Sequence, residues 1–125
     1  MLTDQLYHLN DQHLPLDESI RRIAPAFHRI NFDRARGDAR IRENYERMVA
    51  GGTPELILQS QRALFGQAVW VSASDDHEPC EWIEFLVINF VDVWIEYRSE
   101  ADRARFRPTV LKLAGLLGYE VASHP

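Results

Sequence analysis

Residues 82–97 read WIEFLVINFVDVWIEY and decide the fold, because twelve of these sixteen side chains are apolar. Apolar pairs recur every four residues from Trp82 and Ile83 onward, which keeps them close to one face of an α-helix. Glu84, Asp92 and Glu96 interrupt the run at spacings that a helix gathers into one polar stripe. The pattern therefore predicts a buried central helix.

Part of the same stretch also fits a β-strand. Residues 91–98 alternate between apolar and polar side chains, except at Trp94, and are rich in β-branched and aromatic residues. A single strand of sixteen residues would be far longer than usual, however, and no Gly, Pro or Asn-Gly pair provides a hairpin turn. We therefore prefer the helix and keep an α+β fold, with strands near 68–73 and 85–98, as the alternative.

Further helices are expected on both sides of the central segment. Thr3 is a candidate cap for a short first helix. Residues 17–30 form a second one, for which Pro25 predicts either a kink or a start near the proline. Helices over 38–50 and 53–66 are separated by two glycines, and residues 68–73 either extend the latter or form a short strand. Residues 100–106 form a short helix, and Pro108 begins the last one. The prediction is an all-α single globular domain, residues 1–125, with five or six helices packed around a buried central helix.

Composition places the chain among ordinary globular proteins. It has 125 residues, of which 46% are hydrophobic and 26% charged, enough to bury a core without disulfides. Cys80 is the only cysteine, which excludes an internal disulfide and favours a reducing compartment. The N-terminus lacks a basic segment followed by an apolar run, so we expect a cytoplasmic protein. The central segment is too short and too acidic to cross a bilayer, so no membrane association is expected.

Charge is distributed unevenly along the chain. The net charge is −5, but residues 21–50 carry eight arginines against four acids, and residues 51–100 carry nine acids against two arginines. Arginine forms bidentate pairs with both carboxylates and phosphates, so the basic segment could pair with the acidic one or bind nucleic acid. The acids interleaved with these arginines argue against nucleic-acid binding. The alternative function is a regulator that binds nucleic acid through an arginine-rich face, formed by Arg21, Arg22, Arg29, Arg34, Arg36, Arg40, Arg42 and Arg47.

The acidic segment suggests a function in protein binding. Residues 75–100 contain eight acids and one base, and such a ridge attracts a basic partner and speeds its association. We expect a non-catalytic protein-binding module, such as an immunity or inhibitor protein that masks a basic surface of its partner; a homodimer is also possible. The expected contact residues are Asp75, Asp76, Glu84, Asp92 and Glu96. If this stripe meets the arginine segment inside the fold, the charge argument loses its main support.

Catalytic and cofactor motifs are absent from the sequence. It contains no GxxxxGK[ST], GxGxxG, GxSxG or HExxH pattern. Residues 75–80 offer carboxylates, an imidazole and a thiol, but a zinc site usually needs a second ligand pair, so we expect no metal and no cofactor. A small enzyme or ligand-binding helical domain is the alternative, with a pocket built from His28, Tyr45, His77 and Cys80.

Overall fold

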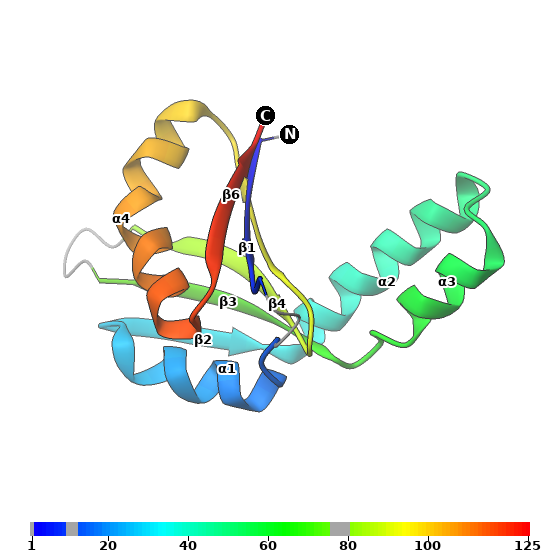
Figure 1. Ribbon diagram of the computed structural model, residues 1–125, viewed down its shortest axis with the longest axis horizontal. Coiled ribbons are helices and arrows are strands. Elements are labelled where there is room, and N and C mark those ends of the chain that lie inside the picture. The colour runs from blue at the N-terminus through cyan, green and yellow to red at the C-terminus, as the bar shows by residue number, and fades with distance from the viewer. Residues whose placement is uncertain (1, 10–12, 76–80) are drawn as a thin grey trace.

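The described residues form one six-stranded antiparallel sheet with four α-helices, so the all-α prediction is wrong and the class is α+β. A computed structural model describes residues 2–9, 13–75 and 81–125 (Figure 1). Along the chain the elements are β1 (Leu2–Tyr7), α1 (Leu16–Ile23), the 3₁₀ turn η1 (Ala24–Ala26), β2 (Arg29–Asp33), α2 (Arg34–Ala50), α3 (Glu55–Arg62), β3 (Ala68–Ser74), β4 (Ile83–Ile88), β5 (Val93–Tyr97), α4 (Glu100–Leu117) and β6 (Glu120–His124).

The strand order is β2-β3-β4-β5-β1-β6. Three hairpin-like neighbours, β3, β4 and β5, make up its centre, and the first strand of the chain inserts between β5 and β6. In this register Thr3 lies opposite both Glu96 and His124. The two ends of the described chain therefore lie side by side (Figure 1).

Residues 82–97 form the β4–β5 hairpin instead of a helix. The turn between the strands contains Phe90 at φ 57°, a left-handed conformation that large side chains rarely adopt. Distant hydrogen bonds hold it: the Asn89 amide donates to Gln67 at 2.8 Å, the Phe90 amide donates to Leu14 at 3.2 Å, and the Asn89 side chain accepts from the Leu16 amide at 2.7 Å. The turn is thus fixed by tertiary contacts, and for that reason no local turn signal appears in the sequence.

Other boundaries differ for similar reasons. The segment after Thr3 is strand β1, because pairing with two neighbouring strands outweighs its short helical pattern. Pro25 ends α1 in a 3₁₀ turn and does not kink a longer helix. Residues 100–117 form one helix that continues through Pro108, since buried side chains on both sides of the proline, Phe106 partly and Val110 fully, pack on the same core. Residues 68–73 form a strand, which was one of the two options.

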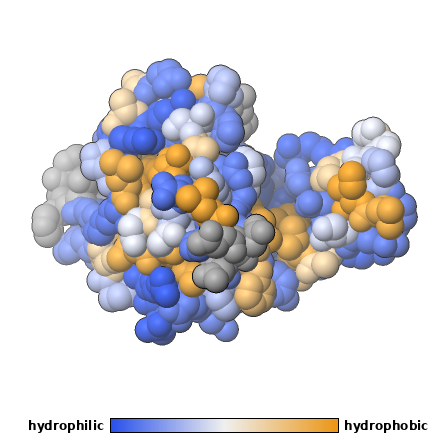
Figure 2. Space-filling view, viewed as in Figure 1, coloured by the Kyte–Doolittle hydropathy of each residue, from blue (hydrophilic) through white to orange (hydrophobic). Residues whose placement is uncertain are grey.

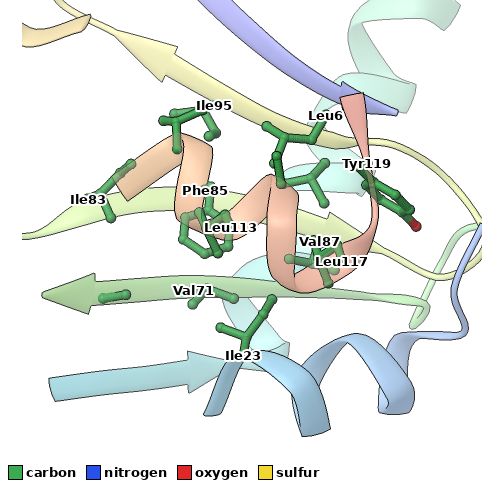
Figure 3. Close-up of a cluster of buried hydrophobic side chains, with 14 of the residues drawn as sticks. Leu6, Ile23, Val71, Ile83, Phe85, Val87, Ile95, Leu113, Leu117 and Tyr119 are labelled. Atoms are coloured by element: carbon green, nitrogen blue, oxygen red, sulfur yellow. The ribbon is translucent and has the colours of Figure 1, made fainter. Parts of the chain in front are cut away.

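The main core lies between one face of the sheet and helices α1 and α4. Alternate residues of the central strands point into it, among them Val71, Phe85 and Ile95, and α4 supplies Leu113 and Leu117 (Figure 3). Helices α1 and α4 therefore cover this face of the sheet.

A charged group is buried at the edge of this core. Asp4 on β1 is fully buried and accepts hydrogen bonds from Tyr97 Oη at 2.8 Å and from Ser123 Oγ at 2.7 Å. Arg103 Nε on α4 lies 3.7 Å from the carboxylate. Burial and the bond to Asp4 together raise the pKa of Tyr97, so its hydroxyl remains a donor. The cluster ties α4 to strands β1, β5 and β6.

Helices α2 and α3 form an antiparallel pair that projects from the body of the protein, and we call residues 34–62 the arm (Figure 1). Only Gly37 and Ile41 of α2, and Leu58 of α3, are buried. Gly37 sits directly on β3: a Cβ at this position would lie 2.7 Å from Cα of Val69. The base of the arm is therefore packed closely against the sheet, while its far end extends away from it.

Candidate functional site

Among the residues that the structure describes, the face of the sheet opposite α1 and α4 is covered only at the base of the arm. Trp70, Leu86 and Trp94 lie in a row across β3, β4 and β5, because they are register partners on this face. Ile41 of α2 packs there with Leu86 and Ile88. Trp94 remains 39% exposed although it lies in the middle of the sheet.

A groove of about 1170 Å³ lies between this face and the arm. Its floor is apolar, with Leu86, Ile88, Val91 and the two tryptophans, and its far end reaches Leu2, Arg98 and Pro125. The side chains that line it from the arm are Arg36, Arg40, Ile41, Asn44 and Gln61, and Leu64 lines it just after the arm.

Arginines of α2 cross the groove to acids on the sheet. The guanidinium of Arg36 lies 4.5 Å from the centre of the Trp70 ring, and its Nη1 lies 3.4 Å from Glu84 Oε1. Trp70 Nε1 and Ser72 Oγ each donate to that same oxygen at 3.3 Å. Arg40 Nη2 forms an ion pair with Glu96 Oε1. One turn of helix thus presents two arginines to two acids on neighbouring strands.

The groove is therefore balanced in charge. Its lining contains three arginines and three acids: Arg36, Arg40, Arg98, Glu84, Asp92 and Glu96. A stacked arginine with a carboxylate is a favourable arrangement, but all four paired side chains remain about one third to one half exposed, so each pair contributes little stability.

The predicted contact residues do not form one acidic ridge. Glu84 and Glu96 lie together in the groove, paired as described. Asp92 lies at its end, where it accepts a hydrogen bond from Gln5 and lies 3.6 Å from His13. Asp75 lies at the end of β3 and accepts from Lys112 Nζ at 2.8 Å, and Asp76 lies outside the described residues. The condition that weakens the charge argument is thus met for Glu84 and Glu96.

The arginines of residues 21–50 are mostly paired within the chain. Arg42 bonds Asp38 at 2.6 Å, and this contact, followed by the Gly66 amide, lowers the pKa of Asp38. Hydrogen bonds from Arg21 and Arg22 lower the pKa of Glu18 to about 2. Further pairs are Arg34–Asp17, Arg36–Glu84, Arg40–Glu96 and Arg47–Glu43. The acids neutralise much of the positive charge of these arginines, which weakens their attraction for a phosphate backbone.

The residues of the enzyme alternative are not gathered in one pocket. The backbone amide of His28, just before β2, donates to Asp75 at 3.3 Å. Tyr45 lies on the arm, where its ring contacts Phe65 and its hydroxyl accepts from Arg62. His77 and Cys80 lie outside the described residues. Among residues 2–9, 13–75 and 81–125, no group of three or more His, Cys, Asp or Glu side chains could hold a metal ion.

The aromatic floor of the groove was missed from the sequence. The available signal was Trp94, which interrupts an otherwise regular alternation by placing a large apolar ring on the polar face of β5. A residue that breaks the pattern in this direction marks an exposed apolar surface on that face. Trp70 gave no comparable signal, because the whole of β3 is apolar or small.

Comparisons with known protein families, with curated proteins and with solved structures found no match. Within the described part of the chain, none of the helices has the length and apolar character needed to cross a membrane.

Proposed function

We propose that the protein is a non-catalytic protein-binding module, of the inhibitor or immunity type, that takes a segment of its partner into the groove and masks it. The observation that carries this proposal is the apolar row of the sheet, in which Leu86 is buried beside the arm but Trp94 remains 39% exposed, while the opposite face is buried beneath two helices. Exposed tryptophans with arginines beside them are the composition typical of the energetic centre of interfaces.

The size and lining of the groove favour a polypeptide segment. Its volume of about 1170 Å³ exceeds that of most small-molecule pockets, which hold roughly 300–1,000 Å³. Arginines line it from the arm and acids line it from the sheet, around an apolar floor, which suits a segment with both apolar and charged side chains. A bound segment would exclude water from the tryptophans and strengthen the surrounding ion pairs.

A basic partner would bind by exchange. Glu84 and Glu96 already hold Arg36 and Arg40, so basic side chains of a partner must take over these carboxylates while the two arginines turn toward solvent. The number of ion pairs then changes little on binding. Association with such a partner should therefore depend on salt less steeply than it would for a free acidic ridge.

The test compares two exposed tryptophans. Immobilised full-length protein captures binding proteins from an extract of the source cell, and each captured protein is then purified and titrated against wild type, Trp94→Ala and Trp82→Ala. Trp82 is 41% exposed, which matches Trp94, but it is not among the residues that line the groove. We expect Trp94→Ala to weaken binding by at least about 2 kcal/mol, or roughly thirtyfold, and Trp82→Ala to have little effect.

The proposal fails if every captured protein binds Trp94→Ala as tightly as wild type, or if the two alanine variants lose affinity equally. A salt titration of the same complexes tests the exchange step. A steep loss of association rate with salt that disappears in Glu84→Gln and Glu96→Gln would show that these acids act as a free ridge.

A further inference from the structure

The free end of the arm carries an apolar surface that nothing in the described chain covers. Val49, Leu56 and Ile57, which we call the tip patch, are 49%, 80% and 47% exposed. They lie on either side of the α2–α3 connection, and Figure 2 shows hydrophobic side chains gathered at this end of the arm. Apolar residues grouped on a projecting element generally mark an interaction site.

The same chain also carries a site into which such a patch fits. The arm and the body enclose the groove from two sides, and together they form a V (Figure 1). The floor of the groove offers an exposed Trp94 and half-buried Val91. An apolar projection and an apolar groove, present once each on every copy, are complementary to one another.

The unpaired charges are also complementary. Glu46 on α2 and Glu55 at the start of α3 are exposed near the tip patch, and in the described part of the chain neither forms an ion pair. Arg98, at the end of the groove away from the arm, is likewise exposed and has no ion pair among the described residues. An acidic tip entering a groove that ends in a free arginine gains attraction without breaking existing pairs.

We infer that the protein forms a two-fold dimer in which the tip patch of each arm packs into the groove of the other copy. Two V-shaped molecules interlock in this way through a closed, isologous interface, so that assembly stops at two copies. The two-fold axis repeats the arm-to-groove contact, and this repetition allows a small patch to contribute to an interface of standard size.

This dimer goes beyond the proposed function and does not depend on it. It requires no foreign partner, and its key surface, the tip patch, lies outside the groove. If both proposals hold, the arm of the second copy is the resident occupant of the groove, and a partner segment must displace it. Partner binding would then convert dimers into complexes that contain a single copy.

The experiment measures the mass of the full chain by analytical ultracentrifugation over a wide range of concentrations. We expect wild type to approach twice the 14.5 kDa chain mass. Leu56→Glu should be mainly monomeric over the same concentrations, because the dissociation constant of the dimer should rise by at least about tenfold. Leu111→Glu is the matched control, since Leu111 is a 52% exposed leucine on α4, and this variant should dimerise like wild type.

A mixing experiment identifies the groove as the receiving site. Trp94→Glu blocks the groove but leaves the arm intact, so alone it should be monomeric. Mixed with Leu56→Glu at the highest concentrations it should form a heterodimer, weaker than the wild-type dimer, because one of the two arm-to-groove contacts is intact. Arg98→Glu replaces Trp94→Glu if circular dichroism shows that the latter does not fold.

Each of the other outcomes overturns the inference. It is wrong if wild type is monomeric at every concentration, or if Leu56→Glu and Leu111→Glu behave alike. It is equally wrong if the groove variant still dimerises alone or the mixture stays monomeric, since either result shows that the arms meet tip to tip or do not meet at all.

Discussion

Replacing Gly37 with alanine should loosen the arm, because α2 packs on β3 at that residue with no room for a side chain. The added Cβ would lie 2.7 Å from Cα of Val69 and 2.8 Å from the carbonyl carbon and oxygen of Ala68. All three are backbone atoms, so rotating a side chain cannot relieve the clash. Carbon atoms normally meet at about 3.5–4.0 Å, so α2 must withdraw from the sheet by roughly 1 Å.

Two effects oppose each other in this substitution. Alanine is a better helix former than glycine by about 0.5–1 kcal/mol. Overpacking against backbone costs about 1–3 kcal/mol. Gly115→Ala supplies the first effect without the second, because Gly115 is also helical and a Cβ there would have no neighbour within 4 Å. The difference in unfolding free energy between the two variants should therefore equal the packing cost, about 1–3 kcal/mol.

Urea unfolding monitored by circular dichroism measures both variants. Gly115→Ala should be as stable as wild type or slightly more stable, and Gly37→Ala should be clearly less stable than Gly115→Ala. Tryptophan fluorescence of folded Gly37→Ala should also change, since Arg36 stacks on Trp70 one residue away. If the two variants have equal unfolding free energies, the close contact between α2 and β3 does not exist in solution, and the shape of the groove derived from it is wrong.

Four other substitutions test three separate features by the same urea assay. Phe90→Asn should raise the unfolding free energy by about 0.5–1 kcal/mol, because asparagine adopts the left-handed conformation more readily than phenylalanine. The Phe90 side chain is 58% exposed, so little packing is lost. A loss of stability would show that the ring packs against the protein in solution. Asp4→Ala should lower the unfolding free energy by about 3–5 kcal/mol, because it leaves Arg103 without its buried partner. Tyr97→Phe should lower it by about 1 kcal/mol, since only one hydrogen bond is lost. A larger loss for Tyr97→Phe than for Asp4→Ala would contradict the buried cluster. Glu18 has a pKa of about 2 in the folded protein against 4.5 for the free group. Its contribution to the free energy of unfolding is therefore complete above pH 4.5 and is lost as the pH falls toward 2. Glu18→Gln should remove that part of the acid dependence, and unchanged pH profiles would refute the assignment.

Local signals in the sequence were sufficient for the two helices of the arm and for one strand, but the expected start after Gly37 is wrong, because α2 begins at Arg34 and runs through that glycine. The two glycines after Ala50 and the Thr53-Pro54-Glu55 start separate α2 from α3 as expected, and residues 68–73 were recognised as a possible strand. The central segment was misassigned because its turn has no glycine, proline or Asn-Gly pair. The bonds that hold this turn come from Leu14, Leu16 and Gln67, which no local window around Phe90 contains.

The site was predictable only in its charges. Glu84 and Glu96 were named as contact residues, and they do lie in the groove, but their pairing with Arg36 and Arg40 depends on how α2 crosses the sheet. Because the segment was interpreted with helical periodicity, these acids were expected along a single helix together with Asp92. In the sheet, alternate residues of β4 and β5 point to opposite faces, so only every second side chain reaches the groove.

The position of β1 affects how the chain is made. This strand is synthesised first, yet it pairs with β5 and β6, and Leu2 lies opposite Tyr97. At about 5–20 residues per second, it waits roughly 5–20 s before its first partner strand exists. During this interval its backbone amides and carbonyls stay unsatisfied by the sheet, while β2, β3 and β4 can already pair. Closing the sheet therefore requires β1 to pair with two strands that come much later in the sequence, which makes this the most non-local pairing in the sheet.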